Sequence, residues 1–498
     1  MAYNYYKEVD PLLPNDKRAP EIQGSRPQSI NDEYIIEEQV SDDKRELRRK
    51  RNGLADLMAL VFGIAFFASI ILVLFPDGPL GDLFGDKPPT PKTLDERVTR
   101  ILEDTPLIDG HNDLAIMIRL LYGNHIYDDK FKEPFEKGGL SGHVDLPRLK
   151  KGKNGGAFWA AYVPCPKNGT DFSDENYFDS IDFTLTQLDV LTRLQAAYPA
   201  HFSTPPNGTT ALSAFKAGQL ISPLAIEGLH QIGNKASNLR LYHSLGVRYA
   251  TLTHNCHNIY ADAALAEGSD GVEKAKPLHG GVTDIGKDLI KEMNRIGMIV
   301  DISHVSVDTM RDVLGGSDSW SGSDAPIMFS HSSAYAVCPH PRNVPDDILQ
   351  LVKKSNSVVM VNFAPDFVSC VANPDNQNGM PDTYPPNSTL SHVVTHIKHI
   401  GDLIGYDYVG LGSDFDGIPS TPKGLDDVSK FPDLVKEMLE RGVSDEDAGK
   451  VVGGNILRVW KDVDIVAAKM QAEGVAPLED KLPAFKLDAF AEDMGGSR

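Results

Sequence analysis

The chain has 498 residues, 41% of them hydrophobic, and a formal net charge of −21 at pH 7. That length allows several domains, although barrels of about 250 residues or more often form a single one. The acidity argues against a nucleic-acid-binding protein, which needs a basic face, and the sequence has neither zinc-ribbon spacing nor a phosphate-binding Gly-Lys-Ser/Thr loop. We therefore expect no nucleic-acid partner.

An uncharged segment, LMALVFGIAFFASIILVLF, extends over residues 57–75. As a helix, its 19 residues would be roughly 29 Å long, close to the roughly 30 Å hydrocarbon core of a bilayer. The basic stretch KRELRRKR (44–51) precedes this segment, and basic residues stay on the cytosolic side of a membrane. The sequence therefore predicts a single-pass type II membrane protein with a cytosolic N-terminus and a lumenal or extracellular remainder.

Cysteines and glycosylation sequons all follow the predicted span, as expected for a glycoprotein with disulfide bonds. The sequons are at Asn168, Asn207 and Asn387, and the cysteines, Cys165, Cys256, Cys338 and Cys370, form no CxxC motif and allow three pairings. We predict a disordered cytosolic tail (1–53), a transmembrane helix (54–75), a linker (76–92), a barrel domain (93–485) and a C-terminal tail (486–498).

After residue 92 the chain repeats a short apolar strand, a polar strand end and a helical stretch. Helices are expected over 176–198, 283–296, 306–314 and 390–404. Eight such units favour an α/β fold, a closed (β/α)8 barrel of the TIM type, over an open doubly wound sheet. No Gly-x-Gly-x-x-Gly follows the first strand, which weakens a dinucleotide-binding alternative. The predicted strands are 106–113, 157–165, 222–228, 247–255, 298–304, 326–333, 357–365 and 408–417.

Ionisable residues stand at or just beyond the carboxyl ends of these strands, where the active sites of such barrels are found. A single strand-end histidine is more often structural, but several facing one mouth indicate a metal centre. The candidates are His111, Asp113, Glu227, His254, His304, His331 and Asp414.

Five of these residues are candidate metal ligands. His111 and Asp113 project the same way in an extended segment and could hold one cation. Glu227 could bridge two ions, and His304 and His331 end successive strands. Imidazole and carboxylate without thiolate suit Zn²⁺, with Mn²⁺, Co²⁺ or Fe²⁺ harder to exclude.

The remaining candidates would act on the substrate. Asp414, with Asp416 as its rival, could carry a proton. His254 and Arg342 could hold a substrate carboxylate or a developing oxyanion, although most loop arginines are solvated. His392, His396 and His399 lack the glutamate of an HExxH motif, and we expect them on a solvated helix face.

The chain closely resembles the membrane dipeptidase family, also called renal dipeptidases, over roughly residues 95–465. The resemblance rests on several long motifs in the same order. They are DGHNDL (109–114), AFWAAYVPC (157–165), AIEGLH (225–230), TLTHN (251–255), DISH (301–304), FSHSSAYAVC (329–338), RNVPDD (342–347), GSDFDG (412–417) and GGNILRVW (453–460).

This resemblance implies a zinc-dependent dipeptidase in which a hydroxide bridging two zinc ions attacks the peptide bond. His111 and Asp113 would bind one zinc, His304 and His331 the other, and Glu227 both. His254, Arg342 and Asp414 would contact the substrate, with Asp414 preferred to Asp416 as the proton carrier and His254 stabilising the oxyanion. Matching cysteines imply the pairs Cys165–Cys256 and Cys338–Cys370.

Other parts of the prediction concern anchoring and alternatives. Animal members of the family carry a C-terminal lipid anchor, whereas this chain ends in AEDMGGSR, so we expect the N-terminal helix to serve instead. No cysteine follows Cys370, so a homodimer would be non-covalent. One alternative is a binuclear-metal amidohydrolase acting on lactams or other amides. A second, of another class, is a catalytically silent adhesion or receptor ectodomain, against which the complete ligand set speaks.

Overall fold

The computed structural model describes residues 58, 60–64, 66, 93–268 and 271–482. The chain divides into two compact units, Met1–Thr90 and Pro91–Arg498. Most of the membrane span predicted over 57–75 lies outside the described residues, as do the predicted tails 1–53 and 486–498 and the linker 76–92. Among the residues that are described, no helix is both long enough and apolar enough to cross a bilayer.

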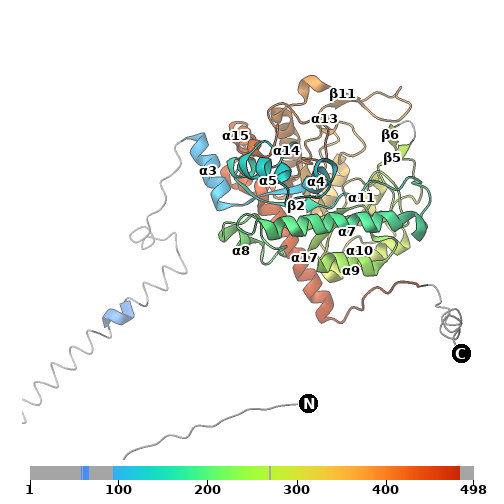
Figure 1. Ribbon diagram of the computed structural model, residues 1–498, viewed down its shortest axis with the longest axis horizontal. Helices are drawn as coiled ribbons and strands as arrows, with labels where there is room; N and C mark the ends of the chain where they lie inside the picture. The colour runs from blue at the N-terminus through green and yellow to red at the C-terminus, as the bar shows by residue number, and fades with distance from the viewer. Residues whose placement is uncertain (1–57, 59, 65, 67–92, 269–270, 483–498) are drawn as a thin grey trace, which may run out of the picture. The chain divides into compact units, whose positions relative to one another are not determined.

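The second unit is built on a closed barrel of eight parallel strands, covered by helices (Figure 1). Each strand pairs with the next along the chain, and the last pairs with the first. All eight predicted strands are present, and the (β/α)8 prediction is confirmed. The barrel strands are β1 (Leu107–Asn112), β2 (Asn154–Ala160), β3 (Leu224–Glu227), β4 (Val247–Thr251), β7 (Ile299–Asp301), β8 (Met328–Phe329), β9 (Val358–Val361) and β12 (Val409–Leu411).

The four predicted helices correspond to α7 (Asp174–Ala197), α10 (Asp284–Ile296), α11 (Val307–Val313) and α14 (Leu390–Ile404). Each begins after a serine or threonine whose hydroxyl accepts a backbone N–H of the first turn, which fixes the start of the helix locally. The other α-helices that the structure describes between residues 93 and 482 are α3 (Leu94–Asp104), α4 (Leu114–Tyr122), α5 (Asp129–Lys137), α6 (Leu146–Lys151), α8 (Ala211–Lys216), α9 (Ala236–Ser244), α12 (Asp346–Lys354), α13 (Pro365–Val368), α15 (Phe431–Glu440), α16 (Asp445–Gly449) and α17 (Asn455–Ala472).

Two hydrophobic clusters hold the barrel together. The larger lies between the strands and the surrounding helices, and the smaller joins strand residues such as Ile108, Phe158 and Met328 to α17. Trp460 of α17 is fully buried with its ring centroid 5.1 Å from that of Phe158. Because α17 packs on this smaller cluster, it leaves the opposite, carboxyl-terminal mouth of the strands open for polar side chains.

Two hairpins lie outside the barrel and were not predicted from the sequence. One pairs β5 (Leu265–Gly268) with β6 (Gly271–Lys274), and the other pairs β10 (Cys370–Val371) with β11 (Asp382–Thr383). Both disulfides implied by the resemblance, Cys165–Cys256 and Cys338–Cys370, are confirmed. Each connects loops at the carboxyl ends of the strands, so the two disulfides tether the segments that surround the mouth.

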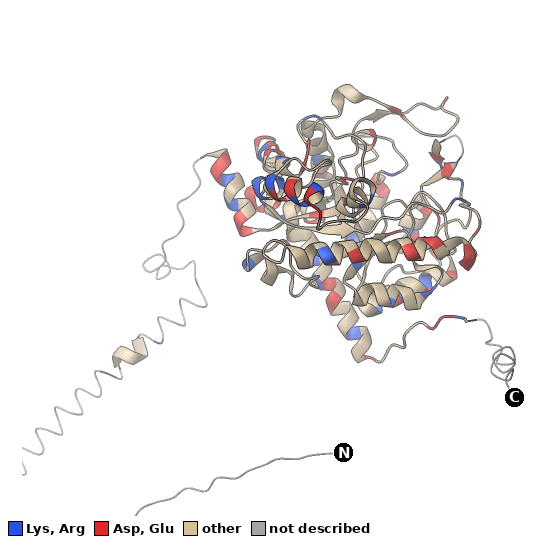
Figure 2. Cartoon of the chain, in the orientation of Figure 1, with Lys and Arg blue, Asp and Glu red and all other residues tan. Residues whose placement is uncertain are grey.

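Charged residues are concentrated on the outer helices (Figure 2). Along α5 three lysines are interspersed with three acidic residues, whereas α15 carries one lysine and three acidic residues, so both signs occur on these helices. The mouth of the barrel, in contrast, carries buried ionisable side chains, and His111, Asp113 and Glu227 are all at most 3% exposed.

Candidate active site and metal centre

The carboxyl ends of the strands surround a cavity of about 520 Å³. Its wall includes Asp113, Glu227, His254, His304 and Asp414, which the sequence places hundreds of positions apart. Two of them hold an unusual backbone conformation, with φ of 67° at His304 and 63° at Asp414. Such a left-handed conformation in a residue other than glycine costs on the order of 1–3 kcal/mol and is found most often where a functional site requires it.

The first group of candidate ligands comes from β1 and β3. His111 Nε2 lies 2.9 Å from Asp113 Oδ2 and 3.6 Å from Glu227 Oε2. The donor atoms of these three residues lie within 4.8 Å of one another, close enough for a single ion. The prediction that His111 and Asp113 project toward one cation therefore fits the geometry.

The second group comes from the ends of β7 and β8. Glu227 Oε1 lies 2.9 Å from His304 Nε2 and 3.3 Å from His331 Nε2, and the two imidazole nitrogens are 3.0 Å apart. Glu227 thus directs Oε2 toward His111 and Oε1 toward His304 and His331. A carboxylate in this position can bridge two cations.

The residues present fit a metal centre. In each histidine the second ring nitrogen is already held, by Tyr249 Oη at 2.6 Å for His111, Asn255 Oδ1 at 3.0 Å for His304 and Ser330 Oγ at 2.7 Å for His331. Partners of this kind fix the orientation of histidines that bind metals. Asp113 Oδ1 is buried and accepts no hydrogen bond from the described residues, which leaves it available to a cation.

Burial strongly perturbs the ionisation of these groups. Burial raises the pKa of Glu227 to about 8, and it lowers the pKa of His304 and His331 well below the usual value. Burial also opposes the charging of His111, but Asp113 and Glu227 outweigh it and hold the pKa of this imidazole well above normal. A divalent cation at the centre would stabilise the carboxylate and the neutral imidazoles together.

Asp414 and Asp416 have different surroundings. The Asp414 carboxylate lines the cavity, accepts from Asn362 Nδ2 at 3.0 Å, and has its pKa raised to about 6 by burial. Asp416 also lines the cavity, but its carboxylate accepts from the backbone N–H of His143 at 2.6 Å, and its own N–H donates to His143 Nδ1 at 2.9 Å. Asp414 therefore has the side chain that is poised toward the candidate ligands, while Asp416 holds a loop.

His254 and Arg342 lie beside the metal centre. The His254 ring lies 4.4 Å from that of His304 and 5.1 Å from that of Tyr162. Arg342 is only 3% exposed, not solvated as expected of a loop arginine, and its guanidinium lies 5.0 Å from the centre of the Phe367 ring. Burial lowers its pKa to about 10, so it stays cationic at neutral pH and can receive a carboxylate.

Some site residues were not identified from the sequence. Tyr162, Asn255, Glu267 and Asn362 contact or line the site. Asn362 directly follows β9, so it stands at a strand end like the other candidates. Its amide does not ionise, and the candidates were chosen among ionisable residues. Glu267 lies on the unpredicted hairpin.

The prediction for the helix with three histidines was partly wrong. His396 on α14 is fully buried, where its Nδ1 accepts from the Ala334 N–H at 3.0 Å and its Nε2 lies 2.8 Å from the Val368 carbonyl. His399 does pair at the surface with Asp346, at 2.8 Å. The helix presents one of its histidines to the core because α14 packs against the barrel, and these histidines stay outside the metal centre.

Sequence comparisons agree with the geometry. The family model described as membrane dipeptidase (peptidase family M19) matches residues 95–474. Dipeptidase aclJ of Aspergillus oryzae is 44% identical over 389 residues, covering 78% of this chain and 84% of that protein. Dipeptidase tcpJ of Claviceps purpurea is 43% identical over 376 residues, covering 75% of this chain and 81% of the relative.

Solved structures show the same relationship. A metallopeptidase from Rhodobacter sphaeroides, determined with a phosphinate mimic of the dipeptide L-Ala-D-Ala, superimposes with a TM-score of 0.58 at 27% identity. The match covers 72% of this chain and 99% of that structure. A crystal structure of the metallopeptidase dipeptidase AC gives a TM-score of 0.59 at 28% identity, covering 72% of this chain and 98% of the other. The chain therefore belongs to the membrane dipeptidase family and is a metal-dependent dipeptidase.

Proposed function

We propose that this dipeptidase works with two zinc ions, one at His111 and Asp113 and one at His304 and His331, with Glu227 shared by both. The position of Glu227 is the observation that supports this most directly. Its two oxygens are directed toward opposite groups, Oε2 to His111 at 3.6 Å and Oε1 to His304 at 2.9 Å. A centre with one ion would use only one of these two groups as ligands.

The residues around the centre divide the work of hydrolysis. Bound zinc ions supply Lewis acidity and a nucleophilic water at neutral pH. Asp414, with a pKa of about 6, is suited to accept the proton of the water and deliver it to the leaving amine. His254, whose pKa burial lowers well below normal, is a neutral donor beside the centre and would stabilise the oxyanion.

Arg342 would select substrates with a free carboxyl end. Its Nη2 donates to the His331 carbonyl at 3.4 Å, while its Nε is buried without a partner among the described residues. A buried cation with an unused donor costs stability unless a ligand completes it. A substrate carboxylate would do so through paired hydrogen bonds.

The test is to purify the full-length chain, measure its metal content, and assay dipeptides against the matching tripeptides. We expect two zinc ions per chain and cleavage of dipeptides. A single bound ion in a fully active enzyme would contradict the shared role of Glu227, and full activity after metal removal would overturn the mechanism.

We further propose that the chain is anchored by an N-terminal helix with its catalytic unit lumenal or extracellular. The two disulfides support an oxidising compartment, and Asn168, Asn207 and Asn387 of the sequons are all exposed. Any homodimer would be non-covalent, because all four cysteines are paired within the chain. Two results would support the proposal: glycosidase-sensitive glycans on these asparagines, and a protein that stays in the membrane during alkaline extraction. An unglycosylated protein that alkaline extraction releases would contradict it.

A further inference from the structure

The two hairpins outside the barrel meet above the active-site cavity. The backbone N–H of Lys274, at the end of β6, donates to the carbonyl of Asn378 at 2.8 Å, in the loop between β10 and β11. Gly379 beside it has a φ of 68°, and a Cβ there would lie 3.1 Å from the Cβ of Lys274. In Figure 1 the loop that carries β11 extends toward β5 and β6.

Both hairpins contribute side chains to the wall of the cavity. Leu265, Glu267 and Val272 come from the first hairpin and Met380 from the second. Val272 is apolar and 40% exposed, so a ligand in the cavity can contact it.

The first hairpin lies only two side chains away from the metal ligands. Glu267 Oε1 is 3.8 Å from His254 Nδ1, and the His254 ring lies 4.4 Å from that of His304. An extended peptide advances about 3.3–3.6 Å per residue. Along these two contacts, the path from the His304 ring to the hairpin is about two to three extended residues long, so a substrate lengthened on that side runs against the hairpin.

The hairpins are also tethered at their bases. Cys256, in the loop that leads to β5, is joined to Cys165, and Cys370 of β10 is joined to Cys338. A rim tethered at two bases and closed by a hydrogen bond between the hairpins resists displacement by a longer ligand.

We propose that these two hairpins, closed by the Lys274–Asn378 hydrogen bond, form the rim that restricts the enzyme to substrates of two residues. The inference rests on the proposed function and adds the element that sets substrate length. Lys274 is a positioning residue that acts through its backbone N–H, far from the chemistry. Without the rim, the same metal centre would accept a third residue.

The test uses a substitution that removes the hydrogen bond alone. Lys274 pairs with Leu265 across the hairpin, while the neighbouring Ala275 N–H donates to the Ala264 carbonyl, so the Lys274 N–H points outward. Lys274→Pro removes that donor without breaking a bond of the hairpin itself. Lys274→Ala is the matched control, because it removes the side chain and keeps the N–H.

Both variants of the full-length protein are assayed with a panel of dipeptides and matching tripeptides. For Lys274→Pro we expect the ratio of tripeptide to dipeptide kcat/KM to rise about tenfold, and for Lys274→Ala to stay within about twofold of the wild type. An equal ratio in the two variants, with metal content and melting temperature preserved, overturns the proposal.

Two further outcomes are separable. If Lys274→Pro fails to fold, Met380→Ala with Met380→Leu as control widens the same rim from the other hairpin, and an unchanged ratio again overturns the inference. If the metal-loaded wild type cleaves no dipeptide, the proposed function fails. If the wild type cleaves dipeptides and the variants have the same tripeptide-to-dipeptide ratio of kcat/KM as the wild type, only the role of the rim is refuted.

Discussion

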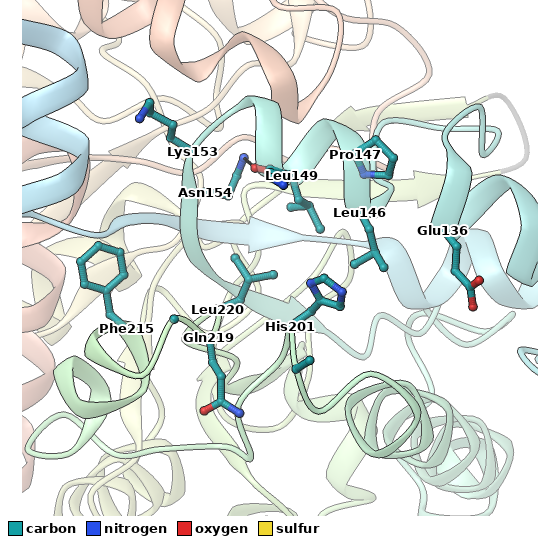
Figure 3. Close-up of a pocket in the computed structure, with 13 residues that line it drawn as sticks. Glu136, Leu146, Pro147, Leu149, Lys153, Asn154, His201, Phe215, Gln219 and Leu220 are labelled. Carbon is teal, nitrogen blue, oxygen red and sulfur yellow. Dashed lines mark hydrogen bonds between the residues drawn. The ribbon is translucent and has the colours of Figure 1, made fainter. Parts of the chain in front are cut away.

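Two cavities of the catalytic unit differ in chemistry more than in size. The one at the carboxyl ends of the strands measures about 520 Å³ and the one beside the segments that precede β2 and β3 about 670 Å³. In the latter, the apolar side chains of Leu146, Leu149 and Leu220 lie centrally, whereas Lys153 and Glu136 lie at opposite sides (Figure 3).

The comparison shows that a cluster of buried ionisable side chains, and not the volume, distinguishes the active-site cavity from the other one. At the mouth, Glu227 and three histidines are within hydrogen-bonding distance of one another or nearly so. At the second cavity, Lys153 forms a surface ion pair with Glu103 at 3.1 Å, and both side chains are substantially exposed. An exposed pair of this kind contributes at most about 1 kcal/mol and needs no ligand.

Removing the metal should have the largest effect on activity, because only the active-site cavity depends on it. Dialysis against a chelator should abolish dipeptide hydrolysis, since the site would lose the Lewis acid that activates water, and added Zn²⁺ should restore it. The measurement is kcat/KM alongside metal analysis. Full activity in a sample verified to be free of metal would contradict the assignment of the strand-end cavity as a metal-dependent active site.

Asp414→Asn should produce the next largest effect. We expect kcat to fall by about 10²- to 10⁴-fold with metal content retained, because an amide cannot carry the proton. Asp416→Asn is the matched comparison and should lose much less, since its carboxylate holds the His143 backbone. Equal losses in both variants would refute the assignment of the proton carrier.

Arg342→Met should sharpen the account of how the mouth selects its substrate. Removal of the buried guanidinium should lower kcat/KM for dipeptides by about 10²-fold, because the substrate carboxylate loses its charged partner. Dipeptide amides, which lack this charge, should be hydrolysed slowly by both proteins, with little difference between them. A similar loss for amides and acids would indicate a structural role for Arg342.

Leu149→Ala at the other cavity should have the smallest effect on catalysis. The side chain is only 4% exposed, so truncation should reduce the free energy of unfolding by about 2–5 kcal/mol. Dipeptide kcat/KM at a temperature where the variant stays folded should be unchanged. A selective loss of activity without loss of stability would show that the second cavity takes part in function.

Much of this site could be predicted from the sequence because its signals are local. An apolar run followed by a polar residue marks a strand end, and eight repeats of this pattern led to the barrel and to His111, Glu227 and His304. The carboxyl ends of parallel strands converge by topology, so their proximity required no knowledge of side-chain packing.

The hairpin residues and the buried histidine were beyond that reasoning. Val272 and Met380 line the cavity only because their hairpins fold over it, and His396 is buried only because α14 packs against the barrel. None of these three positions has a distinctive local pattern.

The sequence by itself determined the eight strands and the candidate ligands, because these depend on residue type and short-range periodicity. Its long motifs in a fixed order indicated the family by resemblance. The tertiary structure decided the separation of Asp414 from Asp416, the burial of Arg342 and the meeting of the hairpins above the cavity. Each of these depends on contacts between segments distant along the chain, such as the Asp416–His143 pair, and the spacing of residues along a chain does not encode such distances.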